Sequence, residues 1–195
     1  MKEFLFTVCL GLVLSGTATA DGHDSMTEDQ AAMMQAWMDA GIQGERHQEM
    51  MKSAGVWEAK MKMWMDPSAP PMEVTYSVTR TPTLGGRVLE EKWEGDFMGQ
   101  PFAGLARGGY DNVSKRYWST WTDNMSTSMM TSYGQYDEEM DAIVMLGEGP
   151  DPVTGGVIPN RSVVRHLSAD EEQFEMYEVH DGQEVKTMEA HLTRK

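Results

Sequence analysis

Three consecutive residues near the start of the sequence could bind a metal ion if the chain is cut just before them. They are Asp21, Gly22 and His23. A free α-amine, two backbone amides and a histidine in third position supply nitrogens in one plane, which is the geometry that suits Cu(II) or Ni(II). The amides bind only after they lose protons, so such a site depends on pH. One hypothesis is therefore that the mature N-terminus captures copper. The alternative is that this tail is inert.

The cut itself is predicted by the residues that precede Asp21. Lys2 is followed by an apolar run over 4–14 and by small residues up to Ala20, which is the pattern of a secretory signal peptide. The run is too short to span a bilayer, which takes about 20 apolar residues. We expect residues 1–20 to be a signal peptide cleaved after Ala20, and the protein to be secreted or periplasmic. We find no second apolar run of this kind and expect no membrane span in the mature chain.

Methionine is a second possible metal ligand, because the sequence contains 19 of these residues and thioethers suit Cu(I). Met61, Met63 and Met65 alternate on one face of an expected strand. Further methionines lie in expected helices: Met33, Met34, Met50 and Met51. Since methionine also fills irregular apolar space, core packing is the alternative interpretation of all these positions.

The other histidines have no spacing typical of a metal site. They are His47, His166, His180 and His191, and none forms a helical His-x-x-x-His pair. Some haem-binding barrels, such as nitrobindin, place an axial histidine late in the chain, where His191 lies. On its expected strand, however, His191 faces away from the apolar positions. If the apolar face points inward, His191 is solvated and cannot bind haem. We assign no metal ligand and no cofactor.

Enzyme signatures are absent from the sequence. It has no Gly-x-Ser-x-Gly elbow and no phosphate-binding loop followed by a helix, and its one cysteine, Cys9, lies in the predicted signal peptide. Carboxylates are plentiful on the expected strands and turns: Asp96, Asp111, Asp123, Glu148 and Asp151. Any two of them could meet as general acid and base, or each could be solvated. We name no catalytic residue, and an enzyme that uses buried carboxylates remains an alternative function.

Aromatic residues recur on the expected strands, where they can line a cavity or fill the core. They are Trp93, Tyr110, Tyr117, Trp118, Trp121, Tyr133 and Tyr177. Tyr117 and Trp118 are consecutive, so in a strand their side chains point to opposite faces. One of the two is therefore expected on the outside.

Two short helices are expected before the strands begin. Residues 27–30 (Thr-Glu-Asp-Gln) resemble a capping box that starts the first helix. Gly41 and Gly44 should break this helix, and a second helical piece over 45–54 ends at Gly55.

From Trp57 onward the apolar residues recur with a period of two, which indicates strands with one buried face. The expected strands cover 57–65, 73–82, 86–95, 101–109, 116–123, 126–136, 141–148, 157–167, 172–179 and 184–193. About ten short strands, with turn residues between them and no helix, predict an antiparallel up-and-down β-barrel, mainly β, with a short N-terminal helical segment.

This organisation divides the chain into a signal peptide over 1–20, a tail and helical segment over 21–54, and a barrel domain over 55–195. A small barrel can hold one small ligand. We therefore favour a binding module for a small, partly apolar ligand. The chain has 16 basic and 31 acidic residues, a formal charge of −15, which repels nucleic acid and anionic lipid. No nucleic-acid partner is expected.

The start of the barrel resembles the calycin superfamily, which includes the lipocalins. The resemblance rests on Gly55-x-Trp57, which follows a short helix and opens the first strand. It implies that Trp57 plugs the barrel base and that a basic residue from the last strand packs over it. Arg194 is placed to do so.

A second resemblance covers most of the chain beyond the predicted signal peptide. It rests on short motifs that follow one another in order: Lys62-Met63-Trp64-Met65-Asp66-Pro67, Leu84-Gly85-Gly86-Arg87, Phe97-Met98-Gly99-Gln100-Pro101-Phe102, Gly109-Tyr110-Asp111-Asn112, Tyr117, Trp121, Asp123, Asp151-Pro152-x-Thr154-Gly155 and Thr193-Arg194-Lys195. Together they are similar to the family called domain of unknown function 1579. The resemblance implies a bacterial, usually exported protein of unassigned activity, and it implies no catalytic residues.

Overall fold

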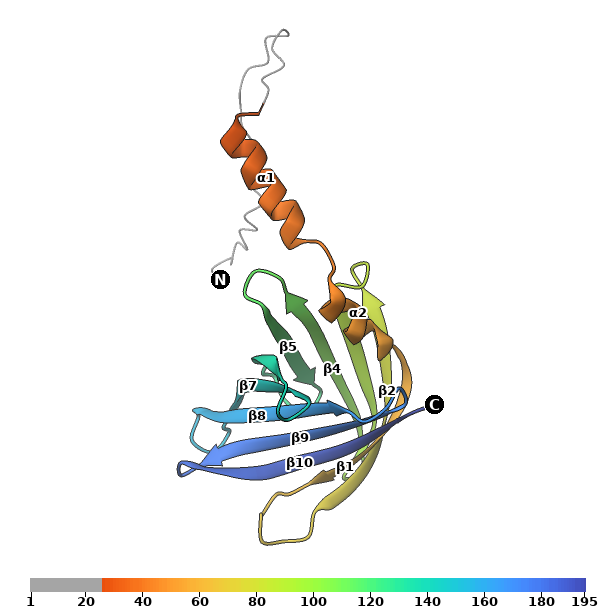
Figure 1. Cartoon of the computed structure of the whole chain (residues 1–195). Helices are drawn as coiled ribbons and strands as arrows, with labels where there is room; N and C mark the ends of the chain where they lie inside the picture. The colour runs from red at the N-terminus through yellow and green to blue at the C-terminus, as the bar shows by residue number, and fades with distance from the viewer. Residues whose placement is uncertain (1–25) are drawn as a thin grey trace, which may run out of the picture. The chain divides into compact units, whose positions relative to one another are not determined.

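The computed structural model describes residues 26–195, so the predicted signal peptide and the Asp21-Gly22-His23 motif lie outside the described residues. The described residues form two helices and ten strands (Figure 1). The helices are α1 (Glu28–Ala40) and α2 (Glu45–Lys52). The strands are β1 (Gly55–Met63), β2 (Met72–Thr83), β3 (Val88–Phe97), β4 (Gln100–Asp111), β5 (Arg116–Asp123), β6 (Met130–Asp137), β7 (Ala142–Pro150), β8 (Val157–His166), β9 (Glu171–His180) and β10 (Gln183–Arg194). The chain divides after Trp37 into two units, and the second holds α2 and these strands.

The strands form a closed antiparallel barrel in which each strand pairs with its neighbours in sequence. The barrel closes where β1 pairs with β10, in a register that sets Trp57 opposite Arg194 and Met63 opposite Met188. This confirms the predicted up-and-down barrel. Closure leaves no unpaired sheet edge along this seam.

Alternation along each strand decides which side chains point into the barrel. On β1, Trp57, Ala59, Met61 and Met63 are buried, while Lys60 and Lys62, which lie between them, are exposed. The apolar face of the strand therefore points inward.

The same alternation on β10 settles the position of His191. Ala190 and Leu192 are buried, and His191 between them is exposed. The apolar face of β10 thus points inward, which places the imidazole outside the barrel. His191 is excluded as an axial ligand for a haem in the interior.

Apart from the start of β6, the expected strand ends agree with the structure to within two residues, and two of the differences matter here. β1 ends at Met63, the last residue paired with both neighbouring strands, and Met65 lies beyond it with 85% of its surface exposed. Met65 therefore does not share the inward face. β6 begins at Met130, later than expected. The preceding segment forms a turn because Asp123 accepts a hydrogen bond from the backbone N–H of Met125 at 2.9 Å.

The predicted capping box of α1 is present. The Thr27 N–H donates to Gln30 Oε1 at 2.9 Å, and the Gln30 N–H donates to Thr27 Oγ1 at 3.2 Å. α1 ends at Ala40, before the glycine expected to break it. No residue of α1 is buried, so Met33 and Met34 are not core residues as the packing interpretation expected. Neither helix is long and apolar enough to cross a membrane.

Helix α2 lies against the end of the barrel at which β4 finishes and β1 begins (Figure 1). The buried His47 fixes it there: its Nε2–H donates to the carbonyl of Tyr110 at 2.9 Å, while its Nδ1 accepts the Gly44 N–H at 3.1 Å. The indole N–H of Trp57 donates to the carbonyl of Ser53 at 2.9 Å. These bonds join the helix to the base of the barrel, which is the base that Trp57 fills.

Candidate binding cavity

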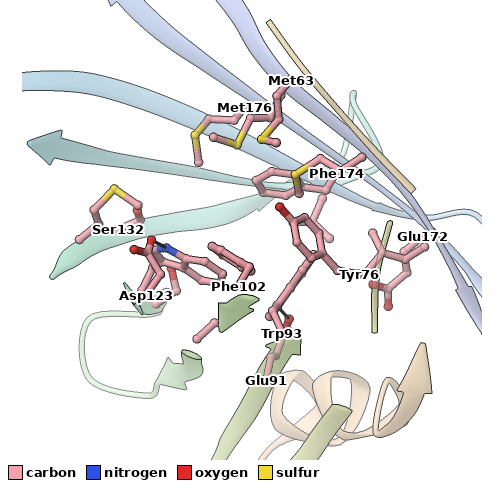
Figure 2. A pocket seen from close by; sticks show the side chains of 18 of the residues that line it. Met63, Tyr76, Glu91, Trp93, Phe102, Asp123, Ser132, Glu172, Phe174 and Met176 are labelled. Atoms are coloured by element: carbon pink, nitrogen blue, oxygen red, sulfur yellow. Dashed lines mark hydrogen bonds between the residues drawn. The ribbon is translucent and has the colours of Figure 1, made fainter. Parts of the chain in front are cut away.

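The interior of the barrel contains a cavity of about 430 Å³ (Figure 2). This volume falls within the range of about 300–1,000 Å³ that is usual for small-molecule sites. Aromatic side chains from β2 to β5 line one part of the cavity. Methionines from β1, β9 and β10 line another. The barrel is therefore hollow and its interior is mostly apolar.

Four aromatic rings on neighbouring strands form a closed circuit on the cavity wall. They are Tyr76, Trp93, Phe102 and Trp121. The ring centroids are 6.1 Å apart for Tyr76 and Trp93, 6.0 Å for Trp93 and Trp121, 6.4 Å for Trp121 and Phe102, and 4.9 Å for Phe102 and Tyr76. These spacings are those of favourable aromatic pairs. We call this set the aromatic wall.

Two glycines leave room for the aromatic wall. A Cβ atom on Gly104 would lie 2.4 Å from Cη2 of Trp121, and one on Gly95 would lie 2.6 Å from Cδ1 of Tyr76. Each ring thus lies directly over a glycine of the neighbouring strand. Any larger residue at these positions would push the ring into the cavity.

Replacing Gly104 with alanine is therefore expected to displace Trp121 and lower the free energy of unfolding by about 1–3 kcal/mol. Urea unfolding followed by tryptophan fluorescence measures the loss. Gly108→Ala is the matched control on the same strand, because a Cβ atom there meets only ordinary contacts, the nearest at 3.5 Å. Equal losses in the two variants would contradict the explanation.

Methionines face the rings from other strands. The register places Met63 beside Met72 of β2 and Met188 of β10, and Met188 beside Met176 of β9, so the four lie in one row across neighbouring strands. Figure 2 shows Met63 and Met176 across the cavity from Tyr76 and Phe102. Flexible thioethers can adapt to ligands of different shape. The predicted inward face is thus confirmed for Met63, and Met61 also lines the cavity.

Each tryptophan of the aromatic wall is held by a carboxylate on its own strand. The Trp93 Nε1–H donates to Glu91 Oε2 at 3.1 Å, and the Trp121 Nε1–H donates to Asp123 Oδ2 at 2.8 Å. In both cases the partner is two residues away, so it points to the same face. Glu91 and Asp123 both line the cavity.

A buried ion pair lies at the α2 end of the cavity. Arg80 Nη1 donates to Glu172 Oε2 at 2.6 Å, and only 7% of the Arg80 side chain and 2% of the Glu172 side chain are exposed. His166 Nδ1 lies 3.1 Å from the other oxygen of Glu172. Burial favours the neutral carboxyl, but the hydrogen bonds from His166 and Arg80 outweigh it and lower the pKa of Glu172. Glu172 is therefore ionised at neutral pH.

Arg80 has a second acidic neighbour. Its Nε lies 3.4 Å from Glu91 Oε1, a charge contact without the geometry of a hydrogen bond, and Nε has no hydrogen-bond partner. The side chain of Glu91 is 22% exposed, more than that of Glu172. Glu91 thus keeps an oxygen that can accept a further bond.

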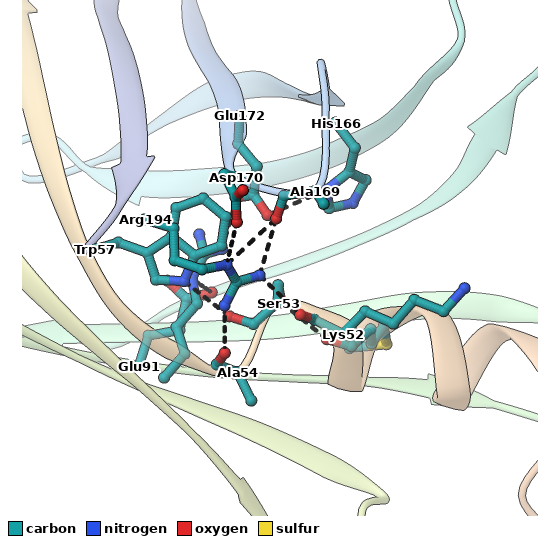
Figure 3. A network of polar contacts seen from close by, with 12 residues as sticks. Lys52, Ser53, Ala54, Trp57, Glu91, His166, Ala169, Asp170, Glu172 and Arg194 are labelled. Carbon is teal, nitrogen blue, oxygen red and sulfur yellow. Dashed lines mark hydrogen bonds and ion pairs between the residues drawn. The ribbon is translucent and has the colours of Figure 1, made fainter.

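Two guanidinium groups lie over the indole of Trp57. The centre of Arg80 is 4.9 Å and that of Arg194 is 4.3 Å from the ring centroid. Arg194 also donates to the carbonyls of Lys52 at 2.9 Å and Ala169 at 3.0 Å, as Figure 3 shows. The contact of Arg194 with Trp57 confirms what the calycin resemblance implied. It joins the last strand to the first and to the end of α2.

Several acids that the sequence singled out do not reach the cavity. Asp96, Asp111 and Asp151 each accept backbone N–H groups in a turn, at 2.7 Å for Asp96 and 2.9 Å for the nearest bonds of the other two. Asp123 is the acid of that set that lines the cavity. Within residues 26–195, no three His, Cys, Asp or Glu side chains converge on a possible metal position.

The aromatic residues divide between the two faces of the barrel. Trp93 and Trp121 line the cavity, and Tyr117 is buried. Its neighbour Trp118 packs outside over Gly109, so the predicted opposition of Tyr117 and Trp118 is confirmed.

Sequence reasoning missed Arg80, Glu91 and Glu172 as cavity residues. A signal for them exists: each occupies a position where the alternation of its strand calls for an inward side chain, as Trp93 shows two residues after Glu91. A charged residue at an inward position is the pattern that would have identified the polar end of the cavity.

The fold and the cavity together define a closed ten-stranded antiparallel barrel with a hollow, mostly apolar interior. Residues 43–194 match the family described as protein of unknown function (DUF1579), and the chain belongs to this family. The predicted family is thus confirmed.

A solved structure, described as the crystal structure of Rv2717c from M. tuberculosis, has a similar fold. The TM-score is 0.56 at 16% sequence identity, over 79% of this chain and 99% of that chain. At this identity the similarity concerns the fold alone. No curated protein matches the sequence.

Proposed function

We propose that the protein binds a small, partly apolar ligand inside the barrel. The observation that carries the proposal is the cavity of about 430 Å³ between the aromatic wall and the methionines. Burial of apolar surface supplies about 25 cal/mol per Å², and the cavity offers such surface on several sides. Its few polar groups lie at defined places, where they can orient a ligand.

Glu172 does not suit the role of a general acid, which weakens the alternative of an enzyme that uses buried carboxylates. Glu172 is ionised and bound to both Arg80 and His166, so it is not a proton donor at neutral pH. Glu91 and Asp123 each hold an indole N–H. Each acid therefore already has a structural bond.

The first test is the affinity for N-phenylnaphthylamine, an apolar dye that fluoresces when water is excluded from it. We expect saturable binding to the native protein and its loss in Ala106→Phe, because Ala106 lines the cavity. Ala103→Phe is the matched control, since Ala103 is on the same strand but exposed. Circular dichroism verifies that both variants fold. Absence of binding by the native protein, or equal binding by the two variants, would overturn the proposal.

We also propose that the protein is exported and that its mature form begins at Asp21. The apolar run over 4–14 and the small residues before Asp21 support this. Native mass spectrometry of the protein from the exported fraction gives the mass of the chain, which reports the cleavage site. In the same spectrum, any excess mass that disappears on denaturation belongs to a bound ligand.

A further inference from the structure

We propose that the cavity selects ligands that carry a positive charge next to their apolar part, such as hydrophobic amines or quaternary ammonium compounds. This inference rests on the proposed function and specifies its ligand class. It is carried by two independent features of the same cavity, namely the charges of its lining and the aromatic wall.

The charged residues that line the cavity are mostly acidic. Among the described residues that line the cavity, Glu91, Asp123 and Glu172 face one basic residue, Arg80, with no lysine and no histidine. Arg80 is bound to Glu172 at 2.6 Å and makes a longer charge contact of 3.4 Å with Glu91, so a single guanidinium faces three carboxylates. A ligand with an anionic head would be repelled by them, while a cationic head would be attracted.

Two of these carboxylates bind two indoles of the aromatic wall at the N–H edge of each ring. Glu91 accepts a hydrogen bond from the indole N–H of Trp93, and Asp123 accepts one from that of Trp121. The centroids of the two indole rings are 6.0 Å apart. Aromatic faces attract ammonium groups through their quadrupole, and tryptophan does so most strongly. A site that combines aromatic rings with carboxylates therefore has the two kinds of group that attract an organic cation.

The rest of the cavity suits the apolar part of such a ligand. Met63, Met176, Met188, Leu192 and Phe174 line the same cavity and offer apolar surface to it. The formal charge of −15 on the chain adds a long-range attraction that speeds the approach of cations. The two halves of the expected ligand therefore match two parts of the lining.

The test compares three compounds with the same apolar chain and different heads: decyltrimethylammonium, decanol and decanoate. Their affinities are measured by quenching of tryptophan fluorescence at neutral pH, below the concentrations at which micelles form. We expect the ammonium compound to bind about tenfold more tightly than decanoate, with decanol between them. Equal or tighter binding of decanoate would overturn the charge selectivity.

The outcomes separate this inference from the proposed function. If decanol and N-phenylnaphthylamine bind but the ammonium compound does not, the cavity is a binding site and the charge inference is wrong. If none of these compounds binds, the proposed function is wrong as well.

Two isosteric variants test the role of the acids. Glu91→Gln and Asp123→Asn keep an oxygen for the indole N–H but remove the charge, and each is expected to reduce the preference for the ammonium compound severalfold. Glu94→Gln is the control, because Glu94 lies on the same strand as Glu91 with its side chain 54% exposed. An unchanged preference in both cavity variants, or the same loss in Glu94→Gln, would overturn the assignment.

Discussion

Replacement of Arg80 by leucine is expected to lower the free energy of unfolding by about 3–5 kcal/mol. The variant would leave Glu172 buried, with 2% of its side chain exposed, and deprived of its shortest ionic contact. It would also remove the guanidinium that lies over Trp57. Urea unfolding at neutral pH, monitored by circular dichroism, measures the change.

The double variant Arg80→Leu/Glu172→Leu distinguishes the uncompensated charge from lost packing. A buried ion pair replaced by apolar side chains of similar size is often neutral in stability. We therefore expect the double variant to be more stable than Arg80→Leu alone. If the second substitution adds to the loss instead, the pair itself supplies the stability and the explanation is wrong.

The dependence of stability on pH tests the ion pair of Arg80 and Glu172 independently. The pKa of Glu172 is lower in the folded protein than its ordinary value of 4.5. Its contribution to stability is therefore complete above the unfolded pKa and is lost as the pH falls through the folded pKa. Between these values the native protein should lose stability more steeply than the double variant. Identical pH profiles would contradict this assignment.

Trp57→Ala is expected to cost about 3–5 kcal/mol in the free energy of unfolding. The indole is 1% exposed, donates to the carbonyl of Ser53 and lies beneath the guanidinium groups of Arg80 and Arg194. Its removal leaves a void at the base of the barrel. It also removes the residue that Arg80 of β2, Arg194 of β10 and the carbonyl of Ser53 after α2 all contact. Thermal and urea unfolding measure the loss.

Trp118→Ala is the control for Trp57→Ala. Trp118 lies on the outer face of β5 and is only partly buried, so its removal should cost much less. Trp57→Phe keeps a ring but loses the bond to Ser53, and an intermediate loss is expected. Similar losses for Trp57→Ala and Trp118→Ala would show that the base of the barrel has no special role.

The barrel could be predicted because its strands repeat a simple period. The alternation of Trp57, Ala59, Met61 and Met63 needs only the geometry of a strand, so it predicted which face of β1 points into the barrel. The same alternation on β10 predicted that His191 points outward. The strand ends were less predictable, because they depend on local bonds such as the one that Asp123 makes to the turn after β5.

The cavity could be predicted only in outline. Its hollow interior depends on Gly95 and Gly104, each of which matters because a particular ring of the neighbouring strand lies over it. The row that joins Met63 to Met188 and Met176 depends on the register between strands. Neither the register nor the ring positions can be read from one strand alone, so the site emerges only when the strands are paired.

The seam between β1 and β10 has a consequence for the synthesis of the chain. Trp57 pairs with Arg194, so the first strand of the barrel receives its second partner only when the last strand is available. Contacts between such distant segments form slowly, because a long loop must close first. A growing chain therefore cannot close the barrel until β10 has been synthesised and is free to pair with β1. Any export that requires an unfolded chain would thus have time to begin before the barrel shuts.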